Sequence, residues 1–371
     1  MKNTIKILLT SLYLASILPS TGANAADYGR YDRQFPLETV YTLSNDADQN
    51  EVLAFQRYGN RMQEAGRFAT GGTGTGSGLG NQGALALSKN GRYLFAVNAG
   101  SNDVSVFRFS KSGLQLVDRA AEAGLTPVSI TVSHHRVFVV NAGDDSIFGF
   151  RFNPFTGKLT AIPGSYSKLS SDGTAPAQIS FDREGDALVV TEKATNNITT
   201  FTLNQDGTPG QRHVVGAAGI TPFGFAFGRR SQFFVSEAQG GAPDGATVSS
   251  YELMADGNVR LIDGAVAVNQ TAACWLATTP NGRIAFTANT PADSIAAFAI
   301  DSSGHLSLLQ NRAAEENLPR DLAISPDGQV LYTLSGGDQS IGVYRIRHSG
   351  LLRKLESFDS LPPAATGLIV R

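Results

Sequence analysis

Short stretches of alternating apolar and polar residues, separated by Gly, Asn and Asp, run along almost the whole chain. The last third shows the pattern clearly at Asp321–Ser325, Val330–Leu334 and Ile341–Arg345. Alternation over four to eight residues, bounded by turn residues, predicts β-strands. Stretches with a helical period are almost absent. The pattern therefore predicts an all-β protein.

These strands recur in a repeat of about 45–50 residues, which is the spacing of β-propeller blades. Six copies of the unit begin at Gly83, Pro127, Pro176, Pro222, Ala272 and Pro319. Each copy contains four strands, which we call A to D in chain order. Four short strands per repeat predict one four-stranded blade per copy.

A seventh copy is split between the two ends of the chain. Residues 40–45, 51–58 and 62–69 match strands B, C and D, whereas "PPAATGLIVR" at 362–371 resembles an isolated strand A. We therefore predict a seven-bladed propeller over residues 38–371, closed by the C-terminal strand pairing into blade 1. Such closure removes exposed sheet edges.

The first 25 residues predict a secretory signal peptide. Lys2 and Lys6 precede an apolar run from Ile7 to Leu18, and Ala23-Asn24-Ala25 follows as a cleavage site. The run is shorter than the roughly 20 residues that a membrane anchor needs. We expect a secreted or periplasmic protein, no membrane insertion after cleavage, and a short N-terminal extension at 26–37.

Charge and cysteine content exclude several classes of protein. The chain has 30 basic and 32 acidic residues, and losing the two lysines of the signal would leave a formal charge of −4. This balance gives no electrostatic case for binding nucleic acid. The single Cys274 excludes an internal disulfide. We expect a monomer without cofactor or metal, with a small molecule as its partner.

A glycine-rich segment precedes the second blade, with six glycines among residues 71–80. The segment matches neither a Walker loop nor Gly-x-Gly-x-x-Gly, and a strand rather than a helix follows it. We interpret residues 70–82 as a connector from strand D of blade 1 to strand A of blade 2. A flexible connector and a ligand-contacting lid both remain open.

The blade phrases "SKNGRYLFAVNAGSNDVSVFRF" and "LPRDLAISPDGQVLYTLSGGDQSIGVYRI" resemble the seven-bladed propeller lactonases, which include bacterial 6-phosphogluconolactonase and the fungal carboxymuconate lactonising enzyme. The phrases "LVVTEKATNNI", "FVSEAQGGAP" and "QTAACW" resemble a secreted bacterial branch of that family. The resemblance covers about residues 38–371. It implies an active site of His, Arg and Glu at the channel mouth, the face where strand A starts and strand B ends.

Only part of that set is present here. The family's Pro-His reads Pro176-Ala177-Gln178, and its Pro-Arg-His reads Pro222-Phe223-Gly224. Glu237 and Arg320 match the family's Glu and the Arg of the last blade. An exported chain with few basic residues at the mouth, Arg320 and Lys193, does not favour hydrolysis of a cytosolic phosphorylated lactone.

The same geometry nominates candidate site residues. Glu237 and Glu192 are candidate acid–base groups, because two carboxylates brought close together raise one pKa. Arg320 is the candidate for stabilising an oxyanion. The candidate substrate contacts are Gln178, Asp321, Asn98, Asn141, Asn289 and Trp275. Each of these groups can instead satisfy strand ends, loop turns or, for Trp275 beside Cys274, the core.

Other motifs carry weaker signals. No Gly-x-Ser-x-Gly elbow or zincin motif is present, and no loop has the spacing of a calcium-binding repeat. His134-His135 are expected in a turn on the face away from the mouth. Two functions remain open: a lactonase that opens a small cyclic ester, and a non-catalytic propeller that binds a ligand or protein.

Overall fold

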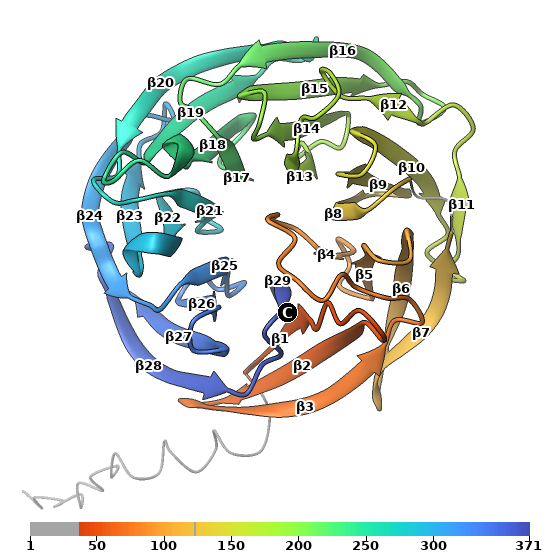
Figure 1. The fold of residues 1–371 in the computed structure, drawn as a ribbon, viewed down its shortest axis with the longest axis horizontal. Coiled ribbons are helices and arrows are strands. Elements are labelled where there is room, and N and C mark those ends of the chain that lie inside the picture. Colours follow the sequence, from red (N-terminus) through yellow and green to blue (C-terminus); the bar gives the residue numbers. More distant parts are fainter. Residues whose placement is uncertain (1–36, 122–123) are drawn as a thin grey trace, which may run out of the picture.

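The computed structural model describes residues 37–121 and 124–371. They form seven antiparallel sheets arranged in a ring, with strand A of each blade nearest the centre (Figure 1). The predicted signal peptide, and all of the predicted extension except Leu37, lie outside the described residues. The all-β, seven-bladed fold is confirmed.

Blades 1 to 4 hold the following strands, in the order A to D. Blade 1 contains β29 (Thr366–Val370), β1 (Glu38–Leu43), β2 (Glu51–Tyr58) and β3 (Arg61–Ala69); blade 2 contains β4 (Leu85–Leu87), β5 (Tyr93–Asn98), β6 (Asp103–Ser110) and β7 (Gly113–Ala120); blade 3 contains β8 (Pro127–Ser133), β9 (Arg136–Asn141), β10 (Ser146–Phe152) and an outer strand in two pieces, β11 (Leu159–Ala161) and β12 (Ser167–Lys168); blade 4 contains β13 (Pro176–Phe181), β14 (Ala187–Glu192), β15 (Asn197–Leu203) and β16 (Pro209–Gly216).

Blades 5 to 7 follow the same order. Blade 5 contains β17 (Pro222–Phe227), β18 (Gln232–Glu237), β19 (Thr247–Leu253) and β20 (Val259–Ala267); blade 6 contains β21 (Ala273–Thr278), β22 (Ile284–Asn289), β23 (Ser294–Ile300) and β24 (Leu306–Glu315); blade 7 contains β25 (Pro319–Ile324), β26 (Val330–Ser335), β27 (Ser340–Ile346) and β28 (Leu352–Asp359). Short 3-10 turns, η1 (Gln239–Gly241) and η2 (Thr290–Ala292), lie in two B–C loops.

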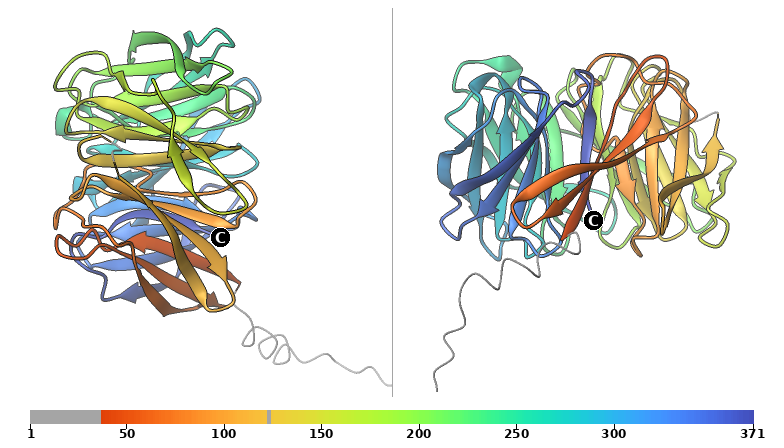
Figure 2. Two further views of the ribbon diagram at one scale, coloured as in Figure 1. Left: turned by 90° about the vertical axis from the view of Figure 1, so that its right-hand side faces the viewer. Right: turned by 90° about the horizontal axis from the view of Figure 1, so that it is seen from below.

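The ring is closed as the sequence predicts. β29 pairs antiparallel with β1, with Val370 opposite Val40 and Leu368 opposite Thr42. The two ends of the described chain therefore lie side by side in one blade (Figure 2). This pairing gives blade 1 the inner strand that its own N-terminal copy lacks.

The outer strand of blade 3 departs from the predicted single strand. β11 and β12 pair with opposite ends of β10, and residues 162–166 interrupt them. Pro163 has no N–H to donate, and Gly164 has a φ of 78°. Together these residues take the chain out of the ladder between the two pieces.

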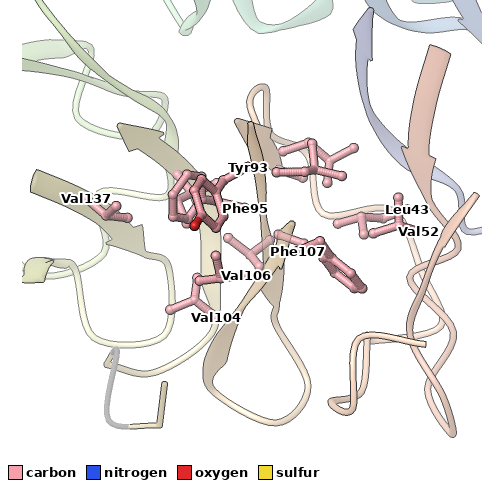
Figure 3. Packing of buried hydrophobic residues seen from close by; sticks show 14 of the residues in the cluster. Leu43, Val52, Tyr93, Phe95, Val104, Val106, Phe107 and Val137 are labelled. Carbon is pink, nitrogen blue, oxygen red and sulfur yellow. The ribbon is translucent and has the colours of Figure 1, made fainter. Parts of the chain in front are cut away.

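The hydrophobic core lies between neighbouring blades rather than at a single centre. In the cluster of Figure 3, side chains from blades 1, 2 and 3 meet, among them Val52 of β2, Phe95 of β5 and Val137 of β9. Large aromatic rings fill much of this space; Phe95 packs edge-to-face on Phe152 at 5.0 Å between centroids. Packing of this kind repeats around the ring and fixes each blade against the next.

Candidate functional site

The five candidate residues that end a strand B occupy equivalent places in their blades. They are Asn98, Asn141, Glu192, Glu237 and Asn289, and all five are fully buried. Each side chain bonds to the following strand C of its own blade. This shared position therefore fastens the B–C hairpin at the mouth face, which is a structural use of the residues.

Glu237 shows the arrangement most completely. Its Oε1 accepts hydrogen bonds from the Gly219 amide at 2.8 Å and the Ser249 hydroxyl at 2.7 Å, with the Tyr251 hydroxyl at 3.5 Å. The Thr247 hydroxyl donates to its Oε2 at 2.5 Å. Burial raises the pKa of Glu237, and these donors oppose the rise. Its two oxygens thus face donors of the protein itself.

Glu192 has a matching environment in blade 4. The Ser170 amide donates to Oε1 at 3.1 Å, and the Thr199 hydroxyl donates to the same oxygen at 2.6 Å. The hydroxyls of Ser170 and Thr195 donate to Oε2. None of these donors is shared with Glu237. The two glutamates therefore occupy separate buried pockets, and the structure does not bring them together as a catalytic pair.

The three asparagines behave alike. Asn98 Nδ2 donates to Asp103 at 2.6 Å and to Ser105 at 2.8 Å. Asn141 donates to Ser146 at 3.0 Å, and Asn289 donates to Ser294 at 3.2 Å. These amides belong to loop hairpins, the alternative that the Asn-Ala-Gly pattern of Asn98 and Asn141 left open.

The glycine-rich segment, residues 70–82, fills space at the centre of the ring, and we call it the plug. Its first half is tied to blade 1, where Asn45 accepts from the Thr75 amide at 3.0 Å and Asp46 O accepts from the Gly74 amide. Its second half, coloured orange before β4, reaches the centre of the ring (Figure 1). Residues 70–82 thus run from blade 1 to the centre of the ring as a bonded connector, and the sequence had left a flexible connector and a ligand-contacting lid open.

The tip of the plug bonds to inner strands on several sides of the channel. Asn81 O accepts from Trp275 Nε1 at 2.8 Å, Asn81 Oδ1 accepts from the Thr366 hydroxyl at 3.2 Å, and Asn81 Nδ2 donates to Val128 O. Gln82 donates to Leu276 O at 2.8 Å and accepts from the Leu276 amide at 3.1 Å. The plug therefore connects blades 1, 3 and 6 through the channel.

Gln178 and Asp321 make lateral bonds of the same kind between neighbouring blades. Gln178 bonds to both backbone groups of Phe225, at 2.7 and 3.0 Å. Asp321 accepts from the Leu322 amide at 2.8 Å and from the backbone of Leu368. Both side chains are buried. They join blades at the channel wall and do not project into open space.

Trp275 is buried and packs against Phe223, with ring centroids 4.9 Å apart. With its N–H bonded to Asn81, this indole supports the plug. Arg320 is half-buried at the mouth of blade 7, where its Nη1 donates to Pro363 O at 3.3 Å. Among the described residues, Arg320 forms no salt bridge.

Lys193 is the mouth residue that the sequence analysis did not nominate. It follows Glu192 directly, and its Nζ donates to Gly80 O of the plug and to Pro176 O at 3.4 Å. The ammonium lies 5.0 Å from the centroid of the Phe223 ring. Burial lowers its pKa to about 8. No carboxylate within the described part of the chain pairs with this amine, which makes Lys193 a candidate for binding negative charge.

The signal for Lys193 was present in the sequence. A lysine directly after the last residue of strand B, in "TEKATNN", stands at the start of a mouth loop. The position of the Lys193 amine depends on its hydrogen bond to Gly80 O of the plug and on its contact with the Phe223 ring of the next blade. These partners lie 113 and 30 positions away, so local pattern does not reveal them.

The remaining candidates contribute no site at the mouth. His134 and His135 are exposed in the turn between β8 and β9, where they line a cavity of about 860 Å³ with Arg136 and Phe155. Burial raises the pKa of the Cys274 thiol to about 12, so it stays protonated. In residues 37–121 and 124–371 there is no cluster of three His, Cys, Asp or Glu residues that could hold a metal ion. The described helices include none long and apolar enough to cross a membrane.

Comparison with known proteins gives a family and a fold. The family model "Lactonase, 7-bladed beta-propeller" matches residues 38–167 and 245–366. The unmatched stretch between them holds all of blade 4 and the inner strands of blade 5, where Ala177, Phe223 and Gly224 stand at the positions to which the resemblance assigns His and Arg. No curated protein matches the chain.

Solved structures share the architecture at low identity. A periplasmic gluconolactonase of Pseudomonas aeruginosa is 16% identical with a TM-score of 0.73, covering 89% of this chain and 99% of that one. A Bacteroides fragilis protein provisionally assigned as a 6-phosphogluconolactonase is 19% identical with a TM-score of 0.70, covering 90% and 98%. A Lactobacillus plantarum protein is 16% identical with a TM-score of 0.75, covering 91% and 100%.

These likenesses show the propeller fold, and the family match covers well over half of the chain, on both sides of residues 168–244. The chain belongs to the seven-bladed β-propeller lactonase family.

Proposed function

We propose that this protein hydrolyses a small lactone at the channel mouth, beside blades 4 to 6, with Lys193 as the group that stabilises negative charge. The observation that carries the proposal is an amine at the mouth of a lactonase-family propeller that has no carboxylate partner among the described residues. An ammonium has three donors. Two of them bond to Gly80 O and Pro176 O, which leaves one for a substrate.

Opening a lactone places negative charge on the carbonyl oxygen and then on the carboxylate product. A fixed cation aimed at that oxygen lowers the barrier most where water is partly excluded. Phe223 and the plug border the Lys193 amine and reduce its contact with water. With a pKa of about 8, the amine is mostly protonated at pH 7. The ammonium is therefore the form that acts.

In this proposal Glu192 and Glu237 have a structural role and do not act on the substrate. Glu192 and Glu237 are buried with both oxygens accepting hydrogen bonds, so a substrate water has no route to them without breaking those bonds. Arg320, on the same face in blade 7, is proposed as a second cation for a substrate carboxylate. Lactones are reactive enough that such a modest set can give turnover.

A pH-stat assay of purified protein against γ-, δ- and sugar lactones tests the proposal. Lys193→Met should lower kcat/KM about 10²-fold or more, whereas Lys89→Met, an exposed lysine in a turn of blade 2, should leave it unchanged. Activity should fall as pH rises through about 8, and Lys193→Arg should remove that fall because arginine stays charged. Full activity in Lys193→Met would exclude this role.

A non-catalytic binding propeller is the second candidate, and the plug favours it. A channel crossed by hydrogen bonds to three blades resembles a rigid platform more than an open active site. Wild-type protein that turns over none of the lactones, but binds a carboxylate through Lys193, would support this alternative.

We also propose that the protein is exported, on the strength of the sequence of residues 1–25. The test is the mass of the protein recovered from outside the cytoplasm. Cleavage after Ala25 is expected, and an intact Met1 in that fraction would contradict the proposal.

A further inference from the structure

A pocket of about 360 Å³ lies between blades 6 and 7 at the outer rim of the mouth face. We call it the rim pocket. Four of the residues that line it are acidic, Asp293, Glu315, Glu316 and Asp338, and two are basic, Arg312 and Lys354. The pocket therefore carries an excess of negative charge in a region that the proposed lactone site does not use.

The basic residues do not neutralise most of this charge. Arg312 pairs with Glu315, at 3.7 Å from Nη1 to Oε1. The Lys354 ammonium lies 5.8 Å from the centroid of the Tyr344 ring. Within the described ranges, Asp293, Glu316 and Asp338 take part in no salt bridge. Three carboxylates thus line one pocket without a salt bridge to any described residue, and Lys354 is the one basic residue there that no acid pairs with.

Glu316 adds an independent sign that a donor is missing. Its side chain is only 3% exposed, and its Oε2 accepts from the Thr333 hydroxyl at 3.0 Å and from the Tyr344 hydroxyl. Its Oε1 is buried and accepts no hydrogen bond from any described residue. An unpaired buried carboxylate oxygen destabilises a fold unless a donor reaches it. A ligand entering the rim pocket can supply that donor.

The arrangement of the acids fits an organic cation better than a metal ion. No three His, Cys, Asp or Glu side chains are close enough to hold a metal in the part of the chain that the structure describes. Asp293 already accepts from the Leu318 amide at 2.9 Å, and Asp338 accepts from Asn317 Nδ2 at 2.7 Å. Each keeps one oxygen for a ligand, on opposite sides of the pocket in blades 6 and 7.

We propose that the rim pocket binds a small aliphatic diamine or polyamine, with one ammonium at Glu316 and Asp338 and another at Asp293. The separated carboxylates match separated ammonium groups. Charge-assisted hydrogen bonds of this kind are stronger than neutral ones. The site is independent of Lys193 and of lactone hydrolysis.

Calorimetric titration of the purified protein with putrescine at low ionic strength tests the proposal. Saturable one-to-one binding is expected. Glu316→Gln and Asp338→Asn should each weaken it at least about tenfold, the effect of losing one charge-assisted hydrogen bond. Lys354→Met should strengthen binding by removing a repelling charge. Glu184→Gln, an exposed acid in blade 4, is the control that should leave binding unchanged.

Asp338 is exposed, so its variant tests the site even if Glu316→Gln folds poorly. Butylamine, which has one ammonium, should bind more weakly than putrescine. Absence of saturable putrescine binding would overturn the proposal, as would equal affinity in wild type and Asp338→Asn. Tighter binding of Ca²⁺ than of putrescine, lost in the same variants, would replace the diamine with a metal.

Discussion

The side-chain amide of Gln82 occupies the space that a side chain at Gly224 would need. A Cβ placed on Gly224 would lie 1.9 Å from Gln82 Oε1. In blades 4 and 7, the residue two places after the first proline of strand A bonds laterally: Gln178 to Phe225, and Asp321 to the backbone of Leu368. Gly224 has no side chain to do so, and Gln82 from the plug bonds Leu276 in its place.

The first prediction is that Gly224→Ala displaces Gln82 and destabilises the ring. Loss of the two hydrogen bonds to Leu276 should cost about 2 kcal/mol of unfolding free energy, since each contributes about 1 kcal/mol. Chemical denaturation measures the change. Gly78→Ala is the matched control, because no atom lies within 4 Å of a Cβ at that position.

A double-mutant cycle then tests the mechanism. Once Gln82→Ala has removed the amide, adding Gly224→Ala should cost less than it does in wild type, and what remains is the cost of the approach of the Cβ to Cys274 O, 2.8 Å away. Strictly additive effects would show that the clash with Gln82 is not the cause of the destabilisation.

The fold could be predicted from sequence because the blade pattern is local and repeated. Each copy carries its own alternation and turns, and the missing first strand of the N-terminal copy indicated that β29 would close the ring. The plug could not be predicted in this way. Gln82 and Leu276 are 194 positions apart in the sequence. The one local sign was Gly224, which has no side chain at a position where other blades have Ser129, Gln178 or Asp321.

The candidate site was predicted less well than the fold, because the sequence pattern does not determine where the side chains at the mouth point. Topology correctly placed the ends of strands B on one face, but it does not say where their side chains point. Hydroxyls of strand C, such as Ser249 and Thr199, bond Glu237 and Glu192 and keep both side chains buried. Lys193 was placed at the mouth but was not a candidate site residue, because its amine contacts Gly80 of the plug and Phe223 of blade 5, which are distant in the sequence.

The second prediction concerns pH and Asp321. Burial raises the pKa of this carboxyl from 3.8 to about 8. The neutral form is therefore favoured in the folded protein, so its stabilising contribution is complete below about pH 4 and is lost as pH rises through about 8. Within this window the unfolding free energy should fall by up to about 1.4 kcal/mol per pH unit.

Asp321→Asn should remove this slope, because the amide does not ionise and still accepts from the Leu322 amide. Urea unfolding at pH 5, 7 and 8.5 measures it. The exposed Asp244→Asn should keep the wild-type pH dependence. A slope that persists in Asp321→Asn would assign the effect to another group.

The third prediction separates structure from catalysis at Glu237. Replacing it with glutamine points an NH₂ group at donors that include Thr247, Ser249 and the Gly219 amide. The variant should lose about 1–3 kcal/mol of unfolding free energy, the cost of unsatisfied buried donors. Folded Glu237→Gln protein should retain the kcat of wild type on any lactone that is hydrolysed.

Thermal unfolding and steady-state kinetics on the same preparation check both halves. Glu184→Gln provides the exposed control. A variant that melts like wild type but has lost turnover would return Glu237 to the role of general base, the hypothesis that its position at the end of strand B first suggested.

The fourth prediction is that removing Gly367–Arg371 opens the ring. The deletion exposes the inner edge of β1, and it removes the buried side chains of Leu368 and Val370. Burial of each stabilises the fold by about 1.5–3 kcal/mol, so the loss should be at least about 3 kcal/mol. It also takes away the Leu368 backbone group that bonds Asp321.

Thermal unfolding and limited proteolysis should show an early transition that begins in blade 1. Arg371→Ala keeps the strand and removes an exposed contact: the guanidinium lies 4.2 Å from the Phe109 ring centroid and donates to Gly91 O at 3.0 Å, so the substitution should cost about 1 kcal/mol, less than the deletion. Equal melting temperatures for the truncated and complete chains would mean that the other blade interfaces hold the ring without its closing strand.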